Sequence, residues 1–377
     1  MDLVDWDLAA STARRIVRVG PQTTSTEAVE IVRELQRLAA EAHAHVVAYT
    51  GLEPDPVLRT SVEVVDRATW AAYNVEGMRR TLGPLAARLG ERRAERRSAN
   101  PPASSFGAGA SRAVSDAATR AGRAVTGAEL GTVLAFLASR VLGQYETFLP
   151  PEAGDGRLLL VAPNIVEVQR RLGADPRDFR MWVCVHEQTH QVQFTAAPWL
   201  GAHLEKLVAR FADAVDLDPR AVVSRLRAAA RDRRVEERDP GDDDGLGSTP
   251  LAMLQSPEQR AVVAEIQALM TLLEGHADQV MDAVGPEVIP TVGLIRRRFE
   301  KRRRERGSPV ERAWRKILGL DAKLAQYRVG GAFCRAVTEA GGPDAMRRAF
   351  AGPEFLPTST ELAAPQTWLA RTAAARA

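Results

Sequence analysis

Along most of this chain, apolar residues recur every three or four positions, which is the spacing of one face of an α-helix. Ala, Leu and Arg are abundant and favour helices, whereas aromatic residues make up only 5% of the sequence. The pattern predicts helices at about 27–49, at about 60–89 with a break at Gly83-Pro84, from near Gly127 to about 143–151, after Asn164, from Pro176, at 261–285 and at 319–337. We therefore expect a mainly α fold with one or a few short strands.

One short segment departs from the helical pattern. Leu158–Val161 is a continuous apolar run of strand length, and we expect it to form a β-strand. It could be the sheet edge along which an extended peptide binds, or a buried strand without a ligand. Asn164 and Glu167 then have the spacing of a helix N-cap and capping box. Asp175 followed by Pro176 predicts the start of the next helix.

Composition and charge exclude several classes of protein. The chain has 51 basic and 48 acidic residues, so its charges nearly cancel and no bulk polyanion partner is indicated. Two cysteines, Cys184 and Cys334, argue against a disulfide scaffold. The opening MDLVDWDLAA lacks the basic-then-apolar layout of a signal peptide, and no uncharged apolar run reaches membrane-spanning length. We expect a cytoplasmic protein with no membrane partner, and the oligomeric state is left open.

Two of the six histidines stand four residues apart in VCVHEQTHQVQF. On a helix, His186 and His190 would lie about 40° apart on one face, so both could bind one ion. Glu187 would be rotated by about 100° from His186, within reach of a water on that ion. This is the H-E-x-x-H pattern, in which two neutral imidazoles hold Zn²⁺ and the glutamate takes a proton from water. The alternative is an ordinary helix with two hydrogen-bonded core histidines.

A catalytic zinc site needs a third protein ligand. Glu274 and Asp278 in LLEGHADQVMD have the E-x-x-x-D spacing of a ligating carboxylate followed by an aspartate that orients a histidine. Glu274 and His276 flank the apolar stripe of their helix on opposite sides, so either could face the histidine pair. We favour Glu274 as the ligand and keep His276 as the alternative. His203 is expected to be structural.

Two further features bear on the chemistry. Tyr327 and His276 are candidates for stabilising a developing oxyanion, although Tyr327 could equally be a core residue. The run Arg296–Arg306 is strongly basic and raises nucleic-acid binding as an alternative function. Its interspersed Glu300 and Glu305 favour a solvated, ion-paired helix instead.

Six segments together resemble a known family. They are DWDLAASTARRIV, RVLGQYETF, LLLVAPNI, VHEQTHQVQF, LLEGHADQVMD and GLDAKLAQYRVGGAF. In this order they are similar to the actinobacterial zincin-like metallopeptidase proteins (zinicin type 2) labelled "coenzyme F-420 biosynthesis associated". The similarity extends from about Trp6 to Phe350 and covers nearly the whole chain.

The resemblance implies a mainly helical zincin-like fold and a zinc-dependent hydrolase, without naming a substrate. The family's histidines and glutamate map onto His186, His190 and Glu187, and its E-G-H-A block maps onto Glu274–Ala277. One departure from thermolysin-like enzymes is that 83 residues separate His190 from Glu274.

These observations predict a zinc metallopeptidase that acts on a peptide or a small amide, with Glu187 as general base. The alternative function is a non-catalytic zincin-like scaffold or interaction protein with a structural or absent metal. We predict a single zincin-like domain over residues 1–377, made of an N-terminal helical part (1–90), a flexible linker or loop (91–112), a catalytic helical core (113–350) and a frayed tail (351–377).

Overall fold

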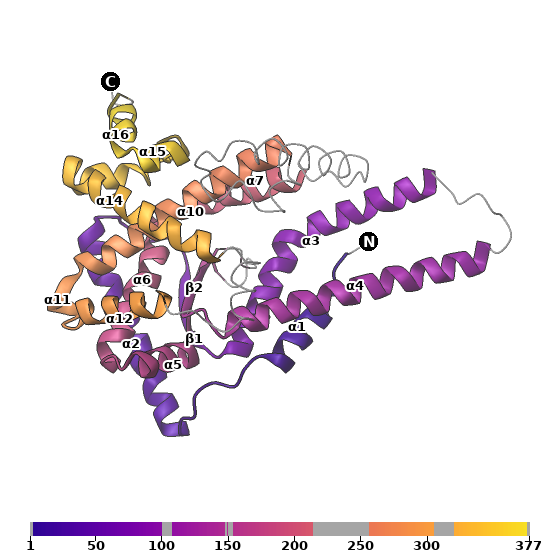
Figure 1. Ribbon diagram of the computed structural model, residues 1–377, viewed down its shortest axis with the longest axis horizontal. Coiled ribbons are helices and arrows are strands. Elements are labelled where there is room, and N and C mark those ends of the chain that lie inside the picture. The colour runs from indigo at the N-terminus through magenta and orange to yellow at the C-terminus, as the bar shows by residue number, and fades with distance from the viewer. Residues whose placement is uncertain are drawn as a thin grey trace, which may run out of the picture. The chain divides into compact units, whose positions relative to one another are not determined.

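The computed structural model describes residues 3–99, 108–147, 149, 154–213, 256–304 and 320–374 (Figure 1). The chain divides into two compact units. The first comprises residues 1–195 and 280–304, and the second comprises residues 196–279 and 305–377. The single-domain description stays a prediction.

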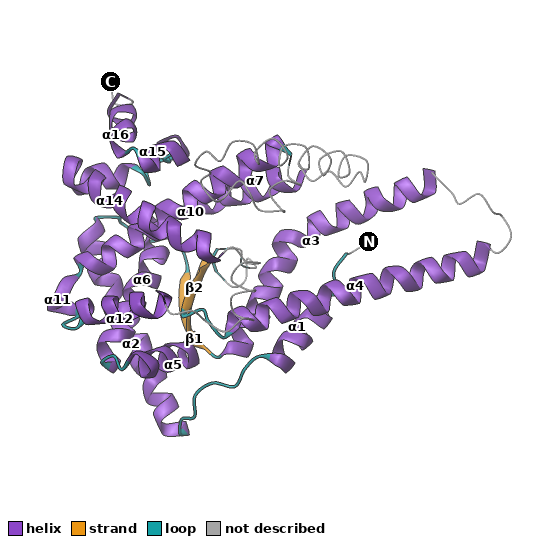
Figure 2. Ribbon diagram, in the orientation of Figure 1, coloured by secondary structure: helices purple, strands orange, loops and turns teal. Residues whose placement is uncertain are grey.

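The first unit is built mainly from helices, with a small sheet among them (Figure 2). This confirms the predicted fold class. Its helices are α1 (Trp6–Ile16), α2 (Ser25–Thr50), α3 (Arg67–Ala99), α4 (Ala108–Ala138), α5 (Ala162–Leu172), α6 (Pro176–Ala196), α11 (Gly285–Val288) and α12 (Val292–Arg304).

Three short strands form the sheet, in the order β1-β3-β2. They are β1 (Thr60–Val65), β2 (Gly143–Glu146) and β3 (Gly156–Val161). β1 is parallel and β2 antiparallel to the central β3. The predicted strand is confirmed, and of its two interpretations the structure supports the buried strand rather than the sheet edge. An apolar run buried on both faces is typical of a central strand, and β3 has a neighbour on each side.

The two outer strands were predicted as helix. Residues 60–65 read TSVEVV, which are largely β-branched residues that favour a strand once β3 is available as a partner. Gly143–Glu146 was expected to end a helix and instead pairs with β3. Both errors have one cause: pairing with a distant buried strand outweighed the local helical pattern.

Each face of the sheet packs on different helices. On one face, Leu159 and Val161 join a cluster formed with α1, α3 and α4, including Trp6, Trp70 and Leu134. α3 and α4 are long and lie side by side beyond this cluster (Figure 1). The opposite face of the sheet packs against α6, which carries the two histidines.

The predicted capping box at Asn164 is wrong. α5 begins at Ala162 and has no side-chain cap. Asn164 and Glu167 instead bind the buried guanidinium of Arg67, whose Nε lies 2.6 Å from Asn164 Oδ1. Leaving a buried guanidinium without acceptors costs more free energy than leaving an exposed helix end without a side-chain cap. Asn164 and Glu167 therefore bind Arg67 instead of capping α5. The predicted start of α6 is confirmed, because Asp175 Oδ1 accepts the N–H of Asp178 at 3.0 Å.

Helix covers both ends of the segment 91–112 that we expected to be a linker. α3 continues to Ala99 and α4 begins at Ala108, and residues 100–107 lie outside the described part of the chain. The acidic, glycine-rich break at 236–249 also lies outside it.

The second unit is helical throughout its described residues. It contains most of α10 (Pro257–Ala283), whose last turn belongs to the first unit, together with α7 (Trp199–Asp213), α14 (Leu320–Arg348), the short 3₁₀ helix η2 (Pro353–Phe355), α15 (Ser359–Ala363) and α16 (Pro365–Ala374). The expectation of a frayed tail is wrong as far as Ala374. Trp368 is fully buried, its ring packs on that of Phe333, and its Nε1–H donates to the Phe355 carbonyl at 2.8 Å.

Among the described helices, none combines the length and the apolar character needed to cross a membrane.

We expect Trp368→Ala to lower the free energy of unfolding of the second unit by about 3–5 kcal/mol, because it removes a large buried side chain and leaves a cavity. Urea unfolding followed by circular dichroism measures the change. The exposed neighbour Gln366 supplies the control, Gln366→Ala, which should cost little. Equal effects of the two substitutions would contradict a packed C-terminal segment.

Candidate metal centre

Helix α6 is held firmly against its surroundings in the first unit. Gln188 Oε1 lies 3.1 Å from His43 Nδ1 on α2, and Gln191 Nε2 donates to Thr60 Oγ1 on β1 at 2.9 Å. These two glutamines fix the rotation of α6 about its axis. Because His186 and His190 are four residues apart, the same rotation sends both imidazoles to a different face from Gln188.

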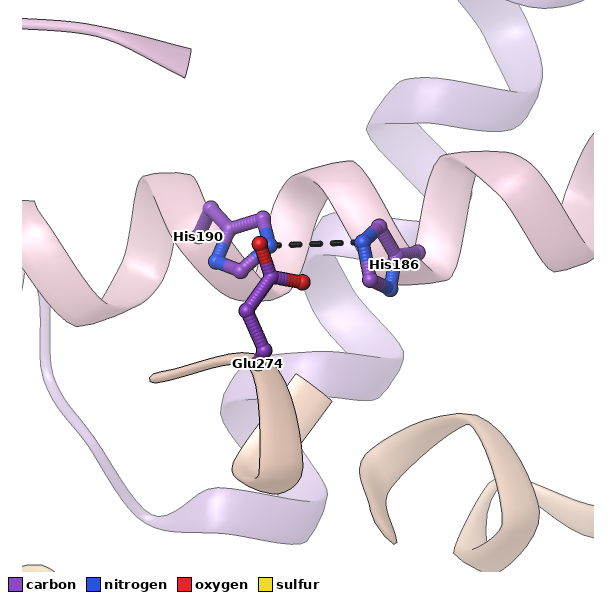
Figure 3. Close-up of side chains that lie close together, drawn as sticks. All are labelled: His186, His190 and Glu274. Carbon is purple, nitrogen blue, oxygen red and sulfur yellow. Dashed lines mark hydrogen bonds between the residues drawn. The ribbon is translucent and has the colours of Figure 1, made fainter. Parts of the chain in front are cut away.

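The two imidazoles converge through their Nε2 atoms, which lie 3.3 Å apart (Figure 3). A zinc ion binds histidine nitrogen at about 2.0–2.1 Å with tetrahedral angles, so two nitrogen ligands on one ion are about 3.3 Å apart. The observed separation therefore fits one edge of a coordination tetrahedron. The rings are nearly perpendicular, at 88°.

The opposite ring nitrogens indicate which tautomer each histidine adopts. His190 Nδ1 lies 3.0 Å from Gln193 Oε1, and His186 Nδ1 lies 3.2 Å from Met281 Sδ. Both partners can accept a hydrogen bond, which suits the tautomer that carries its proton on Nδ1. In that tautomer each Nε2 would present a lone pair toward the other, an arrangement that a cation between them would stabilise.

Glu274 completes a group of three residues that could hold a metal ion. The ligand atoms of His186, His190 and Glu274 all lie within 4.8 Å of one another, and Figure 3 shows the carboxylate directed toward the two rings. Glu274 precedes Met281 by seven residues on α10, which is two helical turns, so both side chains lie on the same face of that helix. The carboxylate is 8% exposed.

His276 lies on a different side of α10. Its buried ring packs against that of Phe350, with centroids 5.0 Å apart. Between the two, Gly275 is in backbone contact with Gly330 of α14: a Cβ on Gly275 would lie 2.1 Å from the carbonyl carbon of Gly330. Residues two apart on a helix point about 200° apart, and the crossing with α14 fixes the rotation of α10 that decides which way each of them points.

Glu187 is buried under the edge of the sheet. It is 6% exposed, and its Cγ and Cδ lie directly beside Gly143 of β2. The position agrees with its expected rotation away from the two histidines on α6. Glu187 directly follows His186 in the sequence, and a carboxylate shielded from bulk water in this way could take part in proton transfer.

The remaining predicted residues are distributed over several places. Asp278 Oδ2 and the guanidinium of Arg335 both lie beside Gly331 of α14. Tyr327 belongs to α14, at a position whose side chain is outside the described residues. His203 packs on Trp199, and burial lowers its pKa. Burial also raises the pKa of the Cys184 thiol, whose Sγ contacts the Leu35 carbonyl, so it is unsuited to act as a nucleophile.

Part of the basic run has structural partners. Arg296 Nε lies 2.7 Å from Asp282 Oδ1, and Arg298 donates to the Leu172 carbonyl at the end of α5 at 2.9 Å. These contacts agree with the ion-paired helix favoured by the sequence. The residues after Arg304 are outside the described range.

Sequence reasoning missed the partners of the imidazoles. Gln193 follows His190 by three residues, so the extended pattern H-E-x-x-H-x-x-Q carried a signal for it. Met281 and Gly143 come from other elements, and no local spacing connects either with α6.

Replacing Gln193 by leucine should lower zinc affinity by about 10–100-fold, because the Nδ1–H of His190 loses its acceptor and the ring its orientation. Competition with a chromophoric chelator measures this. Thr195→Val is a matched control, since it removes a buried hydroxyl from the same helix that donates to the Gln191 carbonyl at 2.8 Å rather than to a predicted ligand. An equal loss of affinity in both variants would indicate general damage to α6.

Three comparisons with known proteins complete the description. No curated protein matches this chain. A crystal structure from Chloroflexus aurantiacus, described as "a putative hydrolase with a novel fold", superimposes with a TM-score of 0.64 at 26% identity over 98% of both chains. The family model of the zincin-like metallopeptidases matches residues 4–369. The chain belongs to the zincin-like metallopeptidase family.

Proposed function

We propose that this protein is a zinc-dependent hydrolase, and specifically a metallopeptidase. The observation that carries the proposal is the convergence of the ligand atoms of His186, His190 and Glu274 within 4.8 Å, with the buried Glu187 between the two histidines on α6. Membership of a metallopeptidase family and likeness to a described hydrolase support the same reaction class.

The donor set fits zinc. Two neutral imidazoles and one carboxylate are the ligands of many catalytic zinc sites, and three protein ligands leave a position open. When bound there, zinc supplies a Lewis acid that acidifies water and polarises a carbonyl group. His186 and His190 would bind through Nε2, with Nδ1 held by Met281 and Gln193.

Glu187 moves the proton in this proposal. Its carboxylate accepts a proton from the attacking water and then gives it to the leaving amine, so one residue acts first as base and then as acid. The edge strand β2 covers the carboxylate and shields it from bulk water.

His276, Tyr327 and Asp278 have supporting roles in the proposal. His276 or Tyr327 would donate a hydrogen bond to the developing oxyanion, and Asp278 would orient a ligand. His276 packs against Phe350, and reaching a substrate would require its ring to turn from that contact.

The substrate class is a peptide or a small amide, because peptide bonds are the substrates of the family and any amide uses the same groups. The competing function is a scaffold that holds metal without turnover. A scaffold would cleave no peptide, so an activity assay on the zinc-loaded protein separates the two functions.

Elemental analysis of protein purified without added metal tests the ligands. We expect about one zinc per chain in the wild type and in His276→Ala, and loss of zinc in Glu274→Ala, since only Glu274 lies with the two histidines. Loss in His276→Ala with retention in Glu274→Ala would move the ligand to His276. No zinc in the wild type after reconstitution would reject the metal site.

Glu187→Gln tests the base. The substitution keeps size but removes the proton acceptor, so we expect kcat to fall by about 10²–10⁴-fold while zinc content stays at the wild-type value. A mixed fluorogenic peptide library on the zinc-loaded protein provides the assay. Glu265→Gln, at an exposed carboxylate paired with Arg210, is the control and should retain activity. Full activity of Glu187→Gln would contradict its role, and an inactive wild type would favour the scaffold.

A further inference from the structure

Gly143, the first residue of β2, lies against the side chain of Glu187. A Cβ at this position would lie 2.6 Å from both Cγ and Cδ of Glu187 and 2.8 Å from the carbonyl oxygen of Leu159. Real Cβ atoms essentially never come within 3.0 Å of such neighbours. The backbone does not require glycine here, because Gly143 has no positive φ. What the position requires is empty space.

The strand cannot easily move away from α6. Gly143 is paired with Leu160 and Tyr145 with Leu158, and both leucines are fully buried. Tyr145 is two residues beyond Gly143 and therefore faces the same side of β2. Its ring packs on that of Phe194 of α6, with centroids 5.6 Å apart. Moving β2 outward would break these pairs and this ring contact together.

The helix is equally constrained. Gln188 and Gln191 bind α2 and β1 respectively. A side chain at position 143 would meet the Leu159 carbonyl, which belongs to the central strand, and the Glu187 side chain. With both backbones fixed, the part that would yield is the carboxylate of Glu187. The shift needed is about 0.8 Å or more, because ordinary contact begins at 3.4 Å.

We propose that Gly143 is a positioning residue for the general base. Its missing side chain creates the space in which the Glu187 carboxylate sits, and the backbone of β2 forms one wall of that space. The inference rests on the proposed function, in which Glu187 takes a proton from water. Proton transfer needs heavy atoms about 2.6–3.2 Å apart, and a displacement of about 1 Å costs roughly 100-fold in rate.

Kinetics of the full-length, zinc-loaded Gly143→Ala variant test this proposal on whichever library peptide the wild type cleaves. We expect zinc content and KM near wild type and a fall in kcat of about 100-fold. Gly131→Ala is the matched control: its Cβ would lie 2.4 Å from the Ala9 carbonyl oxygen, so it disturbs helix packing in the same unit without touching β2 or Glu187. It should lower Tm and leave kcat nearly unchanged. Unchanged kcat in Gly143→Ala, or equal losses in both variants, would overturn the proposal.

A double-mutant cycle in Tm tests the contact without using activity. Gly143→Ala is introduced into the wild type and into Glu187→Ala, which lacks the Cγ and Cδ atoms that the new methyl would meet. The fall in Tm caused by Gly143→Ala should be at least halved in the second background. Equal falls overturn the inference whether or not the protein is an enzyme. An inactive wild type with a positive cycle rejects the proposed function and the positioning role, while leaving the steric contact established.

Discussion

The arrangement of the site depends on the way in which two imidazoles on α6 face each other. Their Nε2 atoms lie 3.3 Å apart, while their Nδ1 atoms lie against Gln193 Oε1 and Met281 Sδ. With the proton of each ring on Nδ1, the two Nε2 lone pairs would point at each other, which is unfavourable without a positive charge between them. The contacts that fix the rotation of α6 therefore maintain a geometry that suits a cation.

Part of this could be read from the sequence, because it depends on spacing within one helix. The four-residue separation of His186 and His190, and the rotation of Glu187 between them, follow from helical geometry once a helix is predicted. The choice between Glu274 and His276 could not be made in this way. It depends on how α10 crosses α14, and the backbone contact of Gly275 with Gly330 is a property of two distant segments.

The errors in the fold have the same origin. TSVEVV and GQYE were assigned to helices because their strand partner, β3, lies far away in the sequence. Asn164 was assigned to a helix cap because the buried guanidinium of Arg67, which binds it, comes from another element. The local sequence pattern thus predicted the helices that form without distant partners. It failed where an interaction with a distant buried group, such as pairing with β3 or binding Arg67, was the more stabilising one.

The chemical character of the imidazole partners also bears on reactivity. In many zinc sites a carboxylate accepts from the histidine Nδ1–H and increases the electron density donated to the metal. Here an amide oxygen and a thioether take that place, and both are uncharged. The thioether is the weaker acceptor of the two. With uncharged partners, Glu274 carries the negative charge among the three predicted ligands, so a zinc ion bound there would keep more of its positive charge for polarising a carbonyl. Because Met281 is only a weak acceptor, the His186 ring is oriented mainly by the packing of buried side chains around it.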